Sequence, residues 1–151
     1  MNTRPGPAPE ALDAIRAWVR LDAAFTAFDK HLRSAYGLTG AQLAMLRIVA
    51  ESGSTTLAEL RARLIMHPAT LGQLIDRLAA KGLVRVARDE RDGRRRRVTP
   101  TEAGRALLGR APLAGPVRLR AVQADPARLR RLAEAFDDAV ELFALSQWVA
   151  A

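Results

Sequence analysis

The sequence predicts a mainly α-helical protein with one small β-hairpin. Over several stretches apolar residues recur every three or four positions, which is the period of a helix with one buried face. Residues 83–99 differ, because apolar and polar residues alternate there on both sides of a turn-rich segment. With 151 residues, 49% of them hydrophobic, the chain is long enough to form one domain with its own core.

The composition favours a polyanionic partner over metal or disulfide chemistry. The chain has no cysteine and only two histidines, so we expect no disulfide, no metal site and no cofactor. The formal net charge is +8 and nearly all the cations are arginine, which suits phosphates, although an arginine-rich genome explains the same bias equally well. The sequence contains neither a signal-peptide pattern nor an apolar run of about 20 residues, so we expect a cytoplasmic location.

The N-terminal third is expected to be one long helix. The first ten residues are rich in proline and glycine and predict a loose arm. A broad apolar face then runs from about Pro9 to Tyr36, and Gly37 supplies the left-handed residue with which helices often end. That face consists of Leu12, Ile15, Trp18, Val19, Leu21, Phe25, Phe28 and Leu32.

Three short helices are expected to follow and to pack as a trihelical unit. The segments Thr39–Gln42 and Thr56–Glu59 are capping boxes, in which a threonine and an acid or amide three residues later satisfy the free amides of a new helix. His67-Pro68 begins the next helix, since proline is tolerated at the first helical position, and Lys81-Gly82 ends it. The turns between these helices are too brief for a crossover strand.

The remaining segments are a hairpin and an interrupted helical region. Residues 83–88 and 95–99 predict two strands joined by a turn, and the next helix begins at a cap that is either Thr99 or Thr101. Pro112, Gly115 and Pro116 should break that helix before it resumes near residue 117. A last helix starts at 125–126, with an apolar face made of Leu129, Leu132, Ala133, Phe136, Ala139, Val140, Phe143 and Trp148.

This order of helices followed by an arginine-rich hairpin is that of a winged helix-turn-helix. In the helix from 68 to 81, Leu71, Leu74, Ile75 and Leu78 share one face and should anchor it. The opposite face suits a DNA major groove, because Gln73 can pair with adenine, Thr70 can contact a thymine methyl group or a phosphate, and Arg77 can reach a base or a phosphate. Two small residues on the same face, Ala69 and Gly72, would allow the helix to approach the DNA closely. The plainer alternative is that this face is polar only because it is solvated.

The hairpin strengthens the prediction of DNA binding. Residues 85–97 hold seven arginines against three acidic residues. A flexible tip at Gly93 can place Arg94 in a minor groove, while Asp92 can hold an arginine through a bidentate contact. A solvated charge run is the alternative. The predicted DNA-binding residues are His67, Ala69, Thr70, Gln73, Arg77, Arg91, Asp92, Arg94, Arg95 and Arg96.

From Tyr36 to Leu108 the sequence resembles the MarR family of bacterial transcriptional regulators. The most specific part runs from LIDRL at 74–78 through KGLV at 81–84 to Asp92-x-Arg94 and Thr101-x-x-Gly104. The resemblance implies a homodimer whose first, fifth and sixth helices intertwine, and which binds a pseudo-palindrome in double-stranded DNA. It also implies that Arg94 enters the minor groove, with Asp92 as its orienting partner.

The sequence supports the dimer independently, because its terminal aromatic residues are hard to bury in so small a monomer; an ordinary intramolecular core is the alternative. The predicted dimer residues are Leu12, Ile15, Trp18, Leu132, Phe136, Val140, Phe143 and Trp148. The resemblance further implies release from DNA by a small aromatic or anionic ligand. Trp18, Phe25, His31 and Arg47 are candidates for its cleft, although a core, cap or surface role explains each of them.

We therefore expect a sequence-specific DNA-binding transcriptional regulator, a repressor released by a ligand, and not an enzyme. The expected parts are an arm and dimerisation helix (1–36), a winged helix-turn-helix (37–104) and C-terminal dimerisation helices (105–151). The alternative is a winged-helix module for protein or RNA contacts. Two features depart from the family: His67 stands where a stronger helix cap is common, and Pro112 and Pro116 interrupt a connection that is usually one long helix.

Overall fold

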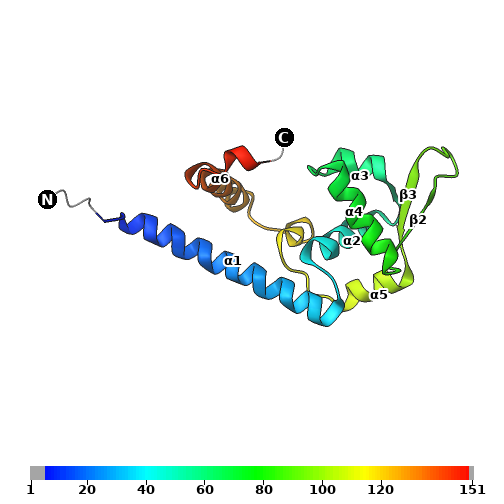
Figure 1. Cartoon of the computed structure of the whole chain (residues 1–151), viewed down its shortest axis with the longest axis horizontal. Helices are drawn as coiled ribbons and strands as arrows, with labels where there is room; N and C mark the ends of the chain where they lie inside the picture. The colour runs from blue at the N-terminus through cyan, green and yellow to red at the C-terminus, as the bar shows by residue number, and fades with distance from the viewer. Residues whose placement is uncertain (1–5, 150–151) are drawn as a thin grey trace.

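The protein has a long N-terminal helix, a central unit of short helices with a small sheet, and a C-terminal helix above the first helix (Figure 1). Figure 1 is a computed structural model, which describes residues 6–149. The mainly helical fold class predicted from the sequence is confirmed. The first residues of the expected N-terminal arm, 1–5, lie outside the described part, and 6–8 are non-helical.

The predicted long helix is confirmed at both of its ends. Helix α1 spans Pro9–Tyr36, and Gly37 follows in the left-handed conformation with φ of 66°. The amide of Gly37 donates to the carbonyl oxygen of Arg33, so that the last turn is closed as the sequence predicts.

The three short helices also begin at their predicted caps. Helix α2 spans Gly40–Ser52, α3 spans Leu57–Arg63 and α4 spans Pro68–Ala80. Both capping boxes are complete, with Thr39 ahead of α2 and Thr56 ahead of α3. These local hydrogen bonds explain why the helix starts are readable from the sequence alone.

The sheet contains one strand more than the predicted hairpin. Strand β2 spans Val84–Arg88 and β3 spans Arg96–Pro100, and the two are antiparallel as expected. A third strand, β1 at Thr55–Thr56, pairs with the outer side of β3 in the order β1-β3-β2. Strand β1 is not predictable from the sequence, because two residues show no alternation and because Thr56 also serves as the cap of α3.

The C-terminal region is interrupted where the prolines predict a break. Helix α5 spans Glu102–Arg110 and is capped by Thr101, since Thr99 lies inside β3. The helix does not resume near residue 117 as predicted: that segment forms only a short 3₁₀ helix at Pro116–Arg120, because Gly115 turns the chain before it. Helix α6 follows and spans Pro126–Leu142.

The predicted C-terminal end of the last helix is wrong. The sequence predicts a helix with Phe143 and Trp148 on its apolar face, but α6 ends at Leu142, Phe143 is its C-cap, and Trp148 belongs to a separate 3₁₀ turn at Ser146–Trp148. The chain turns between them at Ala144, where φ is 56°. Apolar periodicity continues through this turn, so the pattern gave no sign of the break.

The core lies in the central unit and hardly reaches the two terminal helices. Leu32 is the one buried residue of α1 among those described, and α6 has none. The core side chains come mainly from α2, α4 and the sheet; among them are Leu43, Leu46, Val49, Leu60, Leu71, Ile75, Leu78, Val84 and Val98. Within residues 6–149 no helix is both long and apolar enough to cross a membrane.

Two arginines attach the connection between α5 and α6 to helix α2. Arg47 Nη2 donates to the carbonyl oxygens of Ala111 and Pro112, both at 3.0 Å. Farther along, Arg120 Nη2 lies 2.8 Å from Oε2 of Glu51, and this hydrogen bond raises the pKa of Arg120. The path of the interrupted segment is therefore set by α2 as well as by the prolines.

Gly104 provides a test of the packing between α5 and the sheet. A Cβ at this position would overlap the carbonyl oxygen of Leu83 and would lie 3.3 Å from Cδ1 of Leu46. We expect Gly104→Ala to lower the free energy of unfolding by about 1–3 kcal/mol, as overpacking generally does, measured by urea denaturation at constant protein concentration.

The matched control is Gly109→Ala in the same helix, where an added Cβ meets nothing within 4 Å. Alanine is the better helix former by about 1 kcal/mol, so this variant should be as stable as the parent or more stable. If both variants lost stability equally, the close approach at Gly104 would not be the cause.

Candidate nucleic-acid interface and ligand cavity

Helix α4 buries one face and exposes the other, as predicted. Leu71, Leu74, Ile75 and Leu78 are buried in the core. The side chains predicted to contact DNA point outward on the opposite face: Ala69, Thr70, Gln73 and Arg77 are exposed and Gly72 is half-buried. A polar helix face is thus presented on a rigid support.

The N-terminus of α4 is capped by its own histidine. His67 Nδ1 accepts a hydrogen bond from the amide of Ala69 at 3.2 Å, and Pro68 occupies the first helical position. The imidazole therefore supplies the side-chain cap of α4. Nearby, Ile65 is fully exposed in the turn between α3 and α4. Ile65 is not among the predicted site residues, because an isolated apolar residue in a turn carries no periodic signal.

At the wing tip, Asp92 shapes the turn that carries the arginines. Its Oδ1 accepts from the backbone amide of Arg94 at 3.1 Å, and its Oδ2 lies 3.4 Å from Nε of Arg95. The structure thus pairs Asp92 with the backbone of Arg94 and the side chain of Arg95. The side chains of Arg91, Arg94, Arg95 and Arg96 are all exposed.

A second acid, Asp89, holds the base of the same tip and was not selected from the sequence. It is buried, with Oδ1 accepting from the amide of Arg91 at 3.0 Å and Oδ2 accepting from Nη2 of Arg97 at 3.1 Å. Nη1 of Arg97 donates to Oγ of Ser54, so this arginine connects the wing to the loop before β1. The hydrogen bond from Arg91, reinforced by Arg97, lowers the pKa of Asp89.

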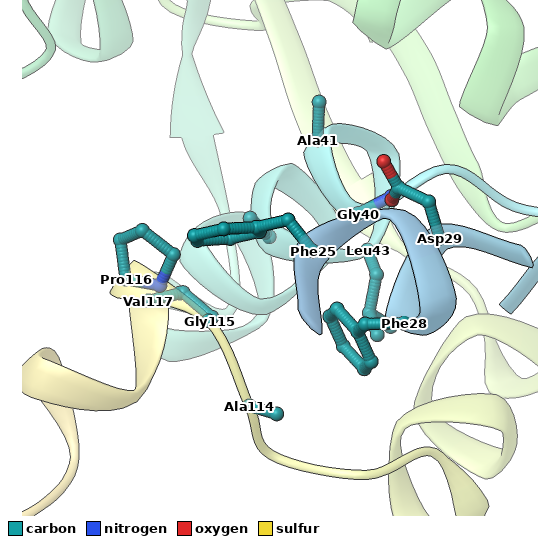
Figure 2. Close-up of a pocket in the computed structure, with 11 residues that line it drawn as sticks. Phe25, Phe28, Asp29, Gly40, Ala41, Leu43, Ala114, Gly115, Pro116 and Val117 are labelled. Atoms are coloured by element: carbon teal, nitrogen blue, oxygen red, sulfur yellow. The ribbon is translucent and has the colours of Figure 1, made fainter. Parts of the chain in front are cut away.

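A cavity of about 250 Å³ lies between α1, the first turn of α2 and the segment after α5 (Figure 2). Its walls include Phe25, Phe28 and Leu43, and the backbone of 114–117 closes one side. Phe25 and Phe28 lie against Gly115, whose φ of 78° turns the chain past the two rings. A second hollow of about 270 Å³ shares both phenylalanines. The connection to α6 therefore forms a wall of the cavity.

The structure brings only one of the four predicted ligand residues, Phe25, into this cavity. Trp18 packs edge-on against Phe143, with 6.0 Å between the ring centroids. His31 packs similarly against Tyr36 at 6.1 Å. Arg47 lines a different hollow and is engaged with the carbonyl oxygens of the connecting segment. The four residues do not share one cleft.

The residues predicted to form the dimer are largely exposed in the single chain. Ile15 is 51% exposed, Phe136 50% and Trp148 70%. Leu12, Trp18, Leu132 and Phe143 are also exposed, whereas Val140 is half-buried. The apolar faces of α1 and of the C-terminal segment thus remain open to solvent along much of their length.

Comparison with known proteins places the chain in a family. A family model described as "MarR family" matches residues 36–95, from the end of α1 through the wing tip. The HTH-type transcriptional regulator TtmR of Methylorubrum extorquens is 34% identical over 105 residues, which are 68% of this chain and 53% of TtmR. The chain belongs to the MarR family. It spans about half the length of this curated relative.

Solved structures share the winged helix-turn-helix fold of this MarR family member. BpsR of Bordetella bronchiseptica superposes with a TM-score of 0.59 at 24% identity, covering 89% of this chain and 97% of BpsR. A mutant of E. coli MarR complexed with operator DNA gives 0.60 at 22% identity, covering 84% and 95%. The predicted family and fold are confirmed, and the family is one of transcriptional regulators rather than enzymes.

The Asp89 contacts predict a wing that loosens when this carboxylate loses its charge. Asp89→Asn keeps an oxygen for the amide of Arg91 but removes the ion pair with Arg97. We expect faster amide hydrogen exchange at Arg91 and in β3, with α2 and α4 unchanged, measured by NMR. Glu90→Gln, an exposed neighbour, is the control.

The pH dependence follows from the lowered pKa of Asp89. A carboxyl group with a lowered folded-state pKa contributes its stabilisation in full above its ordinary pKa and loses it as the pH falls through the lowered value. Acidification over that range should therefore lower the protection factors of the same amides in the parent protein, as Asp89→Asn does at neutral pH, once the rates are corrected for the slower intrinsic exchange of amides in acid. Identical exchange in parent and variant at neutral pH would contradict the assignment.

Proposed function

We propose that this MarR family member is a sequence-specific double-stranded DNA-binding regulator, which acts as a homodimeric repressor released by a small ligand. Helix α4 and the wing strands lie side by side in the central unit (Figure 1). The observation that carries the proposal is that the polar face of this helix and the arginines of this wing are exposed together. Its partner would be chromosomal DNA, for which a cytoplasmic location is the natural setting.

In this proposal α4 enters the major groove. Gln73 would read an adenine through two hydrogen bonds, and Thr70 would contact a thymine methyl group or a phosphate. Ala69 and Gly72 carry little or no side chain, so the helix can approach the base edges closely. The exposed Ile65 lies in the turn that leads into α4 and offers an additional apolar contact for a thymine methyl group.

The wing would bind the neighbouring minor groove and its phosphates. Arg94 lies at the tip, where Asp92 holds its backbone amide, and is the candidate for insertion. Arg91, Arg95 and Arg96 would contact flanking phosphates, which makes the affinity strongly dependent on salt. The ion pair between Asp89 and Arg97 keeps the tip at a defined angle to the sheet, so these two residues would position the wing without touching DNA.

Dimerisation would cover the exposed apolar faces at both ends of the chain. Exposed leucine, phenylalanine and tryptophan side chains on α1 and near the C-terminus are costly to leave in water, at about 25 cal/mol per Å² of apolar surface. A second copy of the chain would bury them and place two winged units side by side, which suits a pseudo-palindromic site. We retain 1–36 and 105–151 as the dimerisation parts and 37–104 as the DNA-binding part.

Ligand release would act through the cavity beside the connecting segment. A molecule seated there would contact α1, α2 and the wall at 114–117, which links the winged unit to α6. A change in the path of this wall would alter the spacing of the two winged units and favour a form that no longer matches the operator. The structure of BpsR, which has the same fold, concerns regulation of its DNA binding by 6-hydroxynicotinic acid.

The direct test is a gel-shift titration of the full chain against the DNA upstream of its own gene, repeated over a series of salt concentrations. Specific binding at moderate salt, with affinity that falls steeply as salt rises, is expected. A protein that bound no duplex DNA but retained a specific protein or RNA complex would instead be a winged-helix module of a different function.

Substitution of Arg94 and Gln73 should separate affinity from sequence preference. Arg94→Ala should weaken binding about tenfold or more at every operator variant, while Gln73→Ala should relax the preference at one base position by about 1–3 kcal/mol and leave the salt dependence unchanged. Fluorescence anisotropy with a set of mutated operators measures both. Unchanged affinity of Arg94→Ala at moderate salt would reject the wing assignment, and an unchanged base preference would reject the reading role of Gln73.

A charge placed on the exposed face of α6 should dissociate the dimer. Phe136 is 50% exposed in the single chain, so a glutamate at this position can remain in water and should leave the fold of the monomer intact. In the proposed dimer, Phe136→Glu buries an unpaired carboxylate in the interface. Sedimentation equilibrium should show a shift toward the monomer, with an unchanged circular dichroism spectrum. Glu134→Lys on the opposite face of α6 is the control and should remain dimeric, whereas a monomeric parent protein would contradict the dimer itself.

A further inference from the structure

The cavity of Figure 2 contains a single charged side chain, and that side chain is acidic. Its walls within the described chain are phenylalanine, leucine, alanine, glycine, proline and valine residues, with the sole exception of Asp29 from α1. A mostly apolar cavity with one charge discriminates among ligands by the sign of their charge, because an unpaired charge is costly to desolvate. The sign of the charge at Asp29 therefore matters for what can bind.

Asp29 already occupies the position that an anion would otherwise take. Its Oδ1 accepts a hydrogen bond of 2.7 Å from the amide of Gly40, the first residue of α2. The amide end of a helix attracts negative charge, and here the chain's own carboxylate satisfies it. A Cβ at position 40 would lie 2.8 Å from the same oxygen, so glycine is the residue that permits this close approach.

The charge of Asp29 is not cancelled by a direct partner among residues 6–149. Lys30 and Arg33 line a separate hollow that also reaches Asp29, but no ion pair joins either of them to its carboxylate within this part of the chain. No hydrogen bond of these residues uses Oδ2 of Asp29 either. One carboxylate oxygen is thus free to accept from a ligand.

The aromatic walls favour the same sign of charge. Phe25 and Phe28 lie on the same helix as Asp29 and line the cavity with it. The face of an aromatic ring attracts cations, and a flat apolar ligand also packs well against such rings. Carboxylate and rings together select a molecule with an aromatic body and a positively charged donor.

We infer that this cavity takes a small aromatic cation, such as a protonated amine or amidine, whose donor group pairs with Asp29. The inference rests on the proposed function, since it names the class of effector for the regulator described above. Of the ligand classes expected from the sequence it keeps the aromatic one, and it replaces the anionic one by a cation.

The test uses three probes of nearly one shape, benzamidine, benzamide and benzoate, which are positive, neutral and negative at neutral pH. Isothermal titration calorimetry with the full chain should give the tightest binding for benzamidine and the weakest for benzoate. Asp29→Asn should lower the benzamidine affinity about tenfold, the size expected for loss of a charge-assisted hydrogen bond, and bring it to the level of benzamide.

Asp29→Asn retains an oxygen that can accept from Gly40, so the start of α2 should persist and circular dichroism should be unchanged. Asp22→Asn, an exposed acid on the same helix away from the cavity, is the matched control and should bind benzamidine as the parent does. Ala114→Phe fills the wall shared by the two hollows without altering the charge, and should abolish binding of all three probes.

Three results would overturn the inference: tighter binding of benzoate than of benzamidine, unchanged benzamidine affinity in Asp29→Asn, or no binding of any probe. A parallel DNA titration separates this inference from the proposed function. Asp29-dependent benzamidine binding by a protein that ignores duplex DNA would uphold the cavity assignment and reject the regulator. Firm DNA binding together with a preference for benzoate would uphold the regulator and reject the cavity assignment.

Discussion

The arrangement of the winged unit depends on a set of backbone hydrogen bonds around Leu83, where helix α4, strand β2 and helix α5 meet. The amide of Leu83 donates to the carbonyl oxygen of Leu78, and its own carbonyl accepts from the amide of Thr101 at 3.0 Å. Oγ1 of Thr101 donates to the carbonyl oxygen of Gly82 and accepts from the amide of Gly104. Because these bonds join the end of α4 to both ends of the hairpin, the helix and the wing form one rigid body.

Because these hydrogen bonds fix the winged unit, the connection to α6 is the part of the chain that can most readily change its path. That connection runs from Ala111 to Asp125 without a continuous α-helix, and its contacts to α2 come from Arg47 and from the ion pair between Glu51 and Arg120. Half-exposed ion pairs contribute little stability, so the contact between Glu51 and Arg120 can be altered at small cost, whereas the hydrogen bonds of Arg47 are partly buried. The cavity lined by Phe25 and Phe28 adjoins the same segment, so in the proposed dimer a ligand bound there would act on the spacing of the two winged units.

The wing illustrates how much of a functional site a sequence can and cannot predict. The exposed arginines at its tip could be predicted, because seven of them in residues 85–97 exceed what a solvated turn requires. The role of Asp89 could not, since three acids lie close together and the sequence does not say which one turns inward. Its burial depends on Arg97, whose guanidinium reaches Ser54 at a separation of 43 residues along the chain. The predicted ligand residues show the same limit, because only Phe25 of the four lies at the cavity.

The sequence by itself determined the starts of α1 to α4, the caps at Thr39, Thr56 and His67, the hairpin and the concentration of arginines in it. These features follow from periodicity and from hydrogen bonds within about four residues, which act whatever the rest of the chain does. The tertiary structure alone decided the two-residue strand β1, the inward turn of Asp89 and the cavity at Asp29. Each of these requires two segments distant in sequence to meet, and that meeting is set by the packing of the whole core rather than by any local pattern.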